Sequence, residues 1–136
     1  MRITDVESHS IRPPYHDFNA HTLQRYHGPL IQSRTVYVLH TDTGLHGIGE
    51  TVGHGHDEDI LREKCVGTDP FDWLNAAADL GLNMATYDLM GKHLGIPAWK
   101  LMGPKVRSWI PVAAWTVSQE PKAMAQEVRQ WETAHC

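Results

Sequence analysis

The feature that most constrains the fold is a hairpin pattern in the first half of the chain. Residues 35–39 are nearly all of the types that favour strands. Asp42-Thr43-Gly44 then provides a glycine-containing turn, and residues 45–51 continue as a second strand. Residues 2–12 alternate between apolar and polar side chains with one irregularity, which predicts a third, half-buried strand. The sequence therefore predicts a three-stranded antiparallel meander.

Helices are predicted to follow this meander. Residues 79–94 carry an apolar face wider than a surface helix needs. Their stop signal is complete, because basic side chains occupy the last turn, Gly95 can form the left-handed cap and Pro97 lies just beyond. Residues 98–102 are expected to add a short helical turn. The fold class is thus α+β.

The last quarter of the chain has a different residue pattern from the helical part before it. Residues 109–115 (WIPVAAW) are apolar on both faces, which is typical of a fully buried parallel strand, although Pro111 cannot donate to a ladder. Ser118 or Glu120 can cap a final helix that follows. One strand and one helix are therefore predicted here.

Composition and charge exclude several classes of function. The net charge is −4 with no basic stripe, which argues against a nucleic-acid partner. No apolar run approaches the roughly eighteen residues of a membrane helix, and no signal peptide opens the chain. Cys65 and Cys136 are isolated thiols, which fits a reducing, cytoplasmic location better than a disulfide framework.

Three motifs resemble a known family. The hairpin over residues 38–50 ends in G-x-G-E, and residues 85–103 read ATYDLMGKHLGIPAWKLMG. Lys105-Val106-Arg107 then leads into the apolar segment. In this order, over about half the chain, they resemble the mandelate racemase and muconate lactonizing enzyme branch of the enolase superfamily. The stretch between Glu50 and Leu82 is shorter than that family usually has.

The resemblance implies a division into two parts. Residues 1–105 would form an enolase-like amino-terminal capping domain, and residues 106–136 the first strand and helix of a (β/α)₈ barrel. Such a barrel takes about 250 residues, so residues 106–136 would supply one unit of eight. In the family, the barrel strands that follow this unit carry the acid/base residues and the three carboxylates that bind Mg²⁺. We therefore expect no catalytic residue and no bound metal in this chain.

The function implied is that of a substrate cap. Enzymes of this family abstract a proton next to a carboxylate, with Mg²⁺ stabilising the enediolate. An acid-sugar dehydratase or a racemase is expected, acting on a small-molecule carboxylate, possibly a sugar acid, and forming a homo-oligomer when complete. The alternative is a non-catalytic binding or assembly module, or the product of a truncated gene.

Residues 13–29 form the best candidate site. They are expected to be a long loop that mixes aromatic surface, hydrogen-bond donors and a cation, as a polar anionic ligand would require. The alternative is an exposed loop that packs against the barrel or a neighbouring subunit. With two residues from the end of the hairpin and the loop after it, the candidate substrate-binding residues are Tyr15, Phe18, His21, Arg25, Tyr26, Glu50 and His54.

Two further groups have competing interpretations. His54-Gly55-His56-Asp57 could contribute to a metal site, but zinc needs four ligands and nothing at suitable spacing completes the set. A substrate-contacting rim or a solvated turn are the other interpretations. Asp88 lies on a largely apolar helix, so we expect it to anchor a neighbouring backbone or Lys92 rather than act as an acid.

Overall fold

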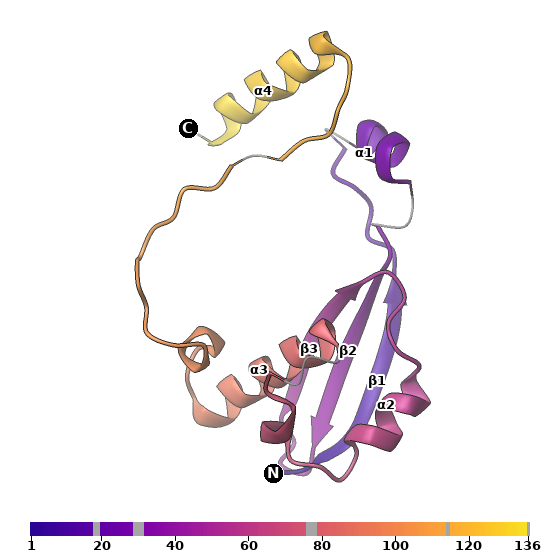
Figure 1. The fold of residues 1–136 in the computed structure, drawn as a ribbon, viewed down its shortest axis with the longest axis vertical. Helices are drawn as coiled ribbons and strands as arrows, with labels where there is room; N and C mark the ends of the chain where they lie inside the picture. Colours follow the sequence, from indigo (N-terminus) through magenta and orange to yellow (C-terminus); the bar gives the residue numbers. More distant parts are fainter. Residues whose placement is uncertain (18–19, 29–31, 76–78, 114, 136) are drawn as a thin grey trace.

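The computed structural model describes residues 1–17, 20–28, 32–75, 79–113 and 115–135 (Figure 1). Along the chain these form β1 (Ile3–Ile11), α1 (Ala20–His27), β2 (Arg34–Thr41), β3 (His46–Val52), α2 (Glu58–Cys65), the 3₁₀ helix η1 (Pro70–Trp73), α3 (Leu80–Leu94), the 3₁₀ helix η2 (Ala98–Leu101) and α4 (Pro121–His135). No helix in this part of the chain is long and apolar enough to cross a membrane.

The three strands form one antiparallel sheet in the order β1-β2-β3, which confirms the predicted meander. Ile11 pairs with Arg34, and Arg34 with Val52, at one end of the sheet. The irregularity expected in the first strand is a register shift between Ile3 and Asp5. The tight turn joins β2 directly to β3, whereas β1 pairs with β2 across the longer segment between Ile11 and Arg34.

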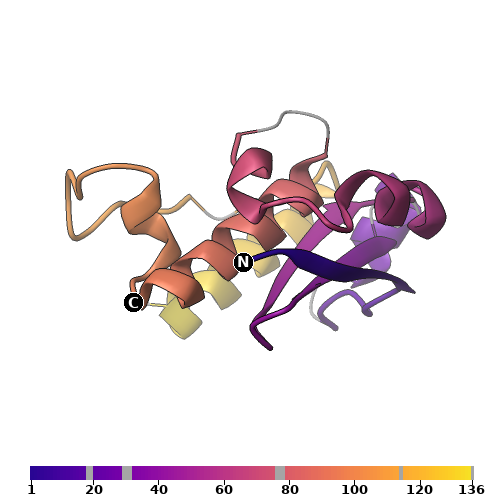
Figure 2. The same ribbon diagram turned by 90° about the horizontal axis from the view of Figure 1, so that it is seen from below.

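Helices cover one face of this sheet. Alternate residues of β2 are buried on that face, and α2 and α3 lie on the same side (Figure 2). The buried core they share with the sheet consists of Ile3, Val6, Tyr37, Leu39, Leu61, Cys65, Leu82, Ala85 and Leu89. Burial raises the pKa of the Cys65 thiol to about 11, so the thiol stays protonated in the core.

Glycines bring α3 unusually close to β3. A Cβ atom on Gly47 would overlap the carbonyl oxygen of Ala85, and one on Gly49 would overlap that of Gly81. From the helix side, a Cβ on Gly81 would lie 2.9 Å from the carbonyl carbon of Glu50. Because these neighbours are backbone atoms, no rotamer change could make room. The G-x-G of the hairpin is therefore a packing requirement.

Both ends of α3 carry the predicted signals. Asp79 caps the first turn, its side chain accepting from the Leu82 amide at 3.0 Å. Gly95 adopts a left-handed φ of 65° at the other end. Midway, Asp88 accepts from the Ile48 amide at 2.9 Å and from Lys92 Nζ at 2.7 Å. The expectation that Asp88 anchors a backbone and Lys92 is confirmed.

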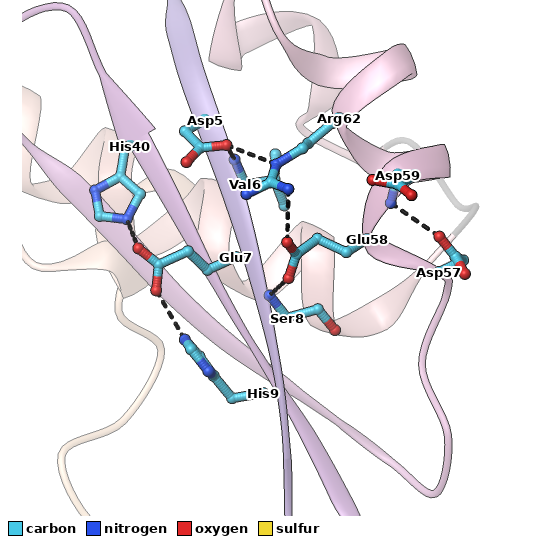
Figure 3. Close-up of polar contacts among 10 residues, drawn as sticks. All are labelled: Asp5, Val6, Glu7, Ser8, His9, His40, Asp57, Glu58, Asp59 and Arg62. Atoms are coloured by element: carbon cyan, nitrogen blue, oxygen red, sulfur yellow. Dashed lines mark hydrogen bonds and ion pairs between the residues drawn. The ribbon is translucent and has the colours of Figure 1, made fainter.

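An ion pair and a hydrogen bond attach α2 to β1 (Figure 3). Arg62 Nε donates to Asp5 Oδ1 at 2.8 Å, and Glu58 accepts from the Ser8 amide at 2.8 Å. The hydrogen bond from Arg62 holds the pKa of the Asp5 carboxyl below its usual value. Both side chains are partly exposed, so solvent screens the pair, which mainly orients α2 rather than supplying much stability.

Two expectations from the sequence differ from the structure. Residues 13–29 contain the helix α1, not only a loop, and Thr22 and His27 of this helix contact residues far along the chain. Conversely, no strand forms within the described part of residues 102–115, whose Trp109 and Val112 are 77% and 86% exposed. A buried parallel strand requires neighbours on both sides, and no described strand lies beside it. The final helix, α4, is present as predicted.

We expect Gly49→Ala to lower the free energy of unfolding by about 1–3 kcal/mol, because the added methyl group pushes α3 off β3. Urea unfolding followed by far-UV circular dichroism measures the loss. His46→Ala is the control, since His46 is exposed on the same strand and its removal should change stability by less than about 0.5 kcal/mol. Equal urea midpoints for Gly49→Ala and the wild type would contradict the packing role.

The exposed apolar segment 106–115 should make the chain self-associate at high concentration, since such backbone can template contacts between molecules. We expect Trp109→Ser combined with Val112→Ser, or deletion of residues 108–136, to reduce static light scattering and to leave the meander and α3 folded. Val128→Ser is the control, because Val128 is 58% exposed on α4. Unchanged scattering in the double variant would show that association has another origin.

Candidate functional site

Two connecting segments leave the sheet at the same end. Since Ile11, Arg34 and Val52 are in register, the segment between β1 and β2 and the loop after β3 both start there. Figure 1 shows α1 beyond this end of the sheet, on the side where α4 also lies. The candidate site is therefore built from loops at one end of a rigid layer, as is common for binding sites.

The loop over residues 53–57 is held against the inner face of the sheet. Thr35 Oγ1 donates to the Gly53 carbonyl and accepts from the Gly55 amide, each at 2.9 Å. The Tyr37 hydroxyl accepts from the His56 amide at 2.8 Å and donates to Asp79 Oδ2 at 3.0 Å. Tyr37 thus links β2, this loop and the cap of α3 in one network.

The buried position of Tyr37 changes its acidity. Loss of hydration, together with the hydrogen bond to the Asp79 carboxylate, raises the pKa of the Tyr37 phenol to about 12, although the bond from the His56 amide acts in the opposite direction. The hydroxyl therefore remains a protonated donor throughout the physiological range. Its role is to fix the loop, not to exchange a proton.

The structure also assigns partners to the residues considered for a metal site. His56 Nε2 lies 3.4 Å from Asp79 Oδ2, and Asp57 caps α2 by accepting from the Asp59 amide at 2.9 Å. His54 is exposed on the same loop. Among the described residues, no three histidine, cysteine, aspartate or glutamate side chains are grouped so that they could hold a metal ion.

A second network joins α1 to the carboxy-terminal part of the chain. Thr22 Oγ1 donates to Gln119 Oε1 at 3.3 Å, and Gln119 Nε2 donates to Thr116 Oγ1 at 3.2 Å and to the buried carboxylate of Glu127. The His27 ring stacks on Trp115 with 5.5 Å between centroids. These contacts attach α1 to residues 115–119.

A pocket of about 540 Å³ lies between α1 and the start of α4. Arg25 is its cation and Glu120 its carboxylate, and the other polar groups are hydroxyl, amide and imidazole side chains. The residues that line it are His21, Thr22, Arg25, Tyr26, Ser118, Gln119, Glu120 and Ala123. Such a lining can bind a small, strongly hydrogen-bonding anion through a guanidinium and several donors.

The pocket brings together three of the seven residues proposed from the sequence, His21, Arg25 and Tyr26. Tyr15 instead donates its hydroxyl to the Gly28 carbonyl at 3.1 Å, which closes the base of the segment around α1. Phe18 lies outside the described residues.

The remaining two proposed residues do not line this pocket. Glu50 lies on the outer face of the sheet, 3.8 Å from Arg34, and His54 belongs to the other loop. Sequence reasoning missed the contribution of residues 118–123. Their only signal was helix capping, which carries no information about a partner helix about a hundred residues earlier.

Comparisons with known proteins give partial matches to curated proteins and to solved structures. No protein-family model matches it. Among curated proteins, the D-galactonate dehydratase of Variovorax paradoxus (strain S110) is 25% identical, in a match that covers 79% of this chain and 35% of that protein. The D-galactonate dehydratase of Cronobacter sakazakii is 29% identical over 61% of this chain and 28% of its own length. The chain therefore spans about a third of the curated relatives it matches.

The fold of this chain is similar to part of several solved structures. An isomerase from Streptomyces coelicolor A3(2) is 26% identical with a TM-score of 0.67, covering 97% of this chain and 42% of that one. A mandelate racemase/muconate lactonizing family protein from Azoarcus sp. EbN1 has a TM-score of 0.69 at 21% identity, over 98% and 39%. An enolase from Pseudomonas fluorescens Pf0-1 with bound magnesium, potassium and tartrate has a TM-score of 0.63 at 20% identity, over 96% and 43%.

The raised pKa of Tyr37 predicts how the stability that the loop network provides depends on pH. Because the folded state holds this proton more tightly than the unfolded chain, the stabilisation is intact below pH 10 and is lost as the pH rises towards about 12. We expect the stability difference between the wild type and Tyr37→Phe to shrink over that range, measured by urea unfolding at each pH. Phenolate absorbance should assign the Tyr37 titration to the upper end of the range. A constant difference would contradict the network.

Proposed function

We propose that this chain, which corresponds to the amino-terminal part of enolase-superfamily proteins of the mandelate racemase/muconate lactonizing branch, caps a binding site for a small carboxylate. The observation that supports this most directly is the polar pocket beyond the end of the sheet, which Arg25 from α1 and residues 118–120 line together. Guanidinium and carboxylate groups match in geometry and charge, so Arg25 is the residue we assign to the ligand's carboxylate.

The other pocket groups suit a polyhydroxylated ligand. His21, Thr22 and Tyr26 can each exchange hydrogen bonds with hydroxyl groups, and Gln119 is positioned by Thr116 and Glu127. The dehydratase relatives act on D-galactonate by name, and the Pseudomonas fluorescens enolase holds tartrate. A sugar acid is therefore the ligand class that we propose.

We further propose the division of labour that the resemblance implies. Residues 1–105 would be the capping domain and residues 106–136 the beginning of the barrel. The described residues do not fit a magnesium ion, since no three suitable side chains are grouped among them. This chain's own contribution is to bind and orient the carboxylate and to exclude water over it, and the acid/base residues would come from barrel strands that follow in the relatives.

A binding module without catalysis is the second candidate. It is supported by the pocket itself, which needs no catalytic group to bind a carboxylate. Both candidates predict carboxylate binding, and they differ in whether a protein that continues into the barrel would convert the bound ligand. Magnesium-dependent dehydration or racemisation of a sugar acid by this chain alone would contradict both of them.

Binding of D-galactonate tests the proposal. We expect amide shifts of α1 and of residues 116–123 to change on titration with D-galactonate in heteronuclear NMR, and not with D-galactose, which has no carboxylate. Arg25→Gln should weaken binding about ten- to a hundredfold, the usual worth of a charge-assisted hydrogen bond.

Arg107→Gln is the matched control, because Arg107 is exposed and lies outside this pocket. Equal affinity of the wild type and Arg25→Gln for D-galactonate would show that Arg25 does not bind the ligand. Amide shift changes confined to the 53–57 loop would show that the ligand binds at that loop instead. Equal responses to D-galactonate and D-galactose would argue against a carboxylate ligand.

A further inference from the structure

The side chain of Gln119 uses both of its amide protons inside the protein. Its Nε2 group donates to Thr116 Oγ1 at 3.2 Å and to the carboxylate of Glu127. A glutamine amide group has two protons to donate, so none is left for a ligand. Within the pocket between α1 and α4, Gln119 can therefore offer a ligand only its carbonyl oxygen.

The hydroxyl group of Thr22 is committed in the same way. Its one proton is donated to Gln119 Oε1 at 3.3 Å, and its lone pairs remain available. Thr22 and Gln119 both line the pocket, and we call the surface that they form the acceptor wall. This wall can accept hydrogen bonds from a ligand but can donate none.

Glu127 determines which way the Gln119 amide group faces. It lies on α4, is only 6% exposed, and does not itself line the pocket. A carboxylate oxygen accepts hydrogen bonds and cannot donate them, so the NH₂ group of Gln119 and not its carbonyl must face Glu127. The opposite orientation would bring two acceptors together away from water. Glu127 therefore holds the acceptor wall in its present polarity.

The buried charge of Glu127 is destabilising for the fold. Its second oxygen, Oε1, is buried and has no hydrogen-bond partner among the described residues. A buried carboxylate oxygen without a partner lowers stability, and an uncharged glutamine of the same shape would lower it less. The charge at this position therefore requires a reason other than folding.

We propose that Glu127 is a positioning residue that makes the pocket selective for sugar acids with a single carboxylate. The proposal rests on the proposed function, in which Arg25 binds the carboxylate of the ligand. Thr22 and Arg25 are three positions apart on α1, so they lie on the same side of that helix, and both line the pocket. A ligand whose carboxylate meets Arg25 thus presents its hydroxyl groups to the acceptor wall.

Ligands with a second carboxylate should bind less well. A terminal hydroxyl group can donate a hydrogen bond to the acceptor wall, whereas a carboxylate would face oxygen atoms that only accept. Glu120, which also lines the pocket, adds repulsion between like charges. Unfavourable contacts of this kind contribute to specificity as much as favourable ones do. The pocket should therefore prefer D-galactonate to galactarate, which has a carboxylate at both ends.

NMR titrations of the full chain with D-galactonate and with galactarate test the proposal. The two ligands differ at carbon 6, which is a hydroxymethyl group in the first and a carboxylate in the second. We expect the wild type to bind D-galactonate at least about tenfold more tightly, the usual worth of a hydrogen bond that involves a charged group. Glu127→Gln should reduce this affinity ratio at least about threefold, because glutamine can donate to Gln119 Oε1 and let the amide group turn.

Glu132→Gln is the matched control, because it makes the same change of charge at an exposed position of α4 and should keep the wild-type ratio. Thr22→Val removes the hydroxyl acceptor at nearly constant volume, so it should weaken binding of D-galactonate more than that of galactarate. Urea unfolding should show Glu127→Gln to be at least as stable as the wild type. A changed affinity ratio could then not be attributed to loss of the fold.

The side-chain NH₂ resonances of Gln119 provide a measurement that needs no ligand. Both protons should be protected from exchange with solvent in the wild type, and at least one should lose this protection in Glu127→Gln. An unchanged affinity ratio in Glu127→Gln, or equal affinity of the wild type for the two ligands, would overturn the proposal and leave the proposed function standing. Failure of both ligands to bind the wild type would contradict the proposed function and this proposal together.

Discussion

Backbone contact between α3 and β3 is the constraint on which the rest of the structure depends. Gly47 and Gly49 let the helix lie directly on the strand, and Gly81 allows the same approach from the helix side. Asp88 then satisfies the Ile48 amide at the sheet edge, so the edge strand is covered by a side chain from the helix. Once α3 is seated, its capping residue Asp79 meets Tyr37 and thereby fixes the 53–57 loop. The site loop is thus positioned by the packing of the core.

The parts of the fold that follow from short-range rules could be predicted from the sequence. The turn at residues 42–44 and the β-forming runs on each side determine the meander, and Asp79 and Gly95 bound α3 by local hydrogen bonding and φ. The structural role of Asp88 could be predicted for the same reason, since Lys92 is one helical turn away. These features involve neighbours in sequence or in a hairpin, where a residue pattern is sufficient.

The candidate site could be predicted only in part, because long-range contacts build it. Thr22 and Gln119 are 97 residues apart, and no pattern near either one indicates the other. This contact accompanies the change of residues 20–27 from the expected loop to a helix and creates half of the pocket wall. For residues 109–113 a strand was predicted and none forms. Their apolar composition suits a strand buried between other strands, and the described structure contains no such neighbours. In both cases tertiary surroundings outweigh local preference.

The thiol of Cys65 can be used to detect local opening of the core. The thiol is fully buried at the end of α2, and its pKa of about 11 leaves almost no thiolate at neutral pH. A thiol reagent can therefore reach it only when the core around it opens. In a chain with Cys136 replaced by serine, the rate of alkylation would report how often this part of the core opens. Since Arg62 and Glu58 orient α2 on β1, the same rate in variants of these residues would show how little or how much their contacts add to the closed state.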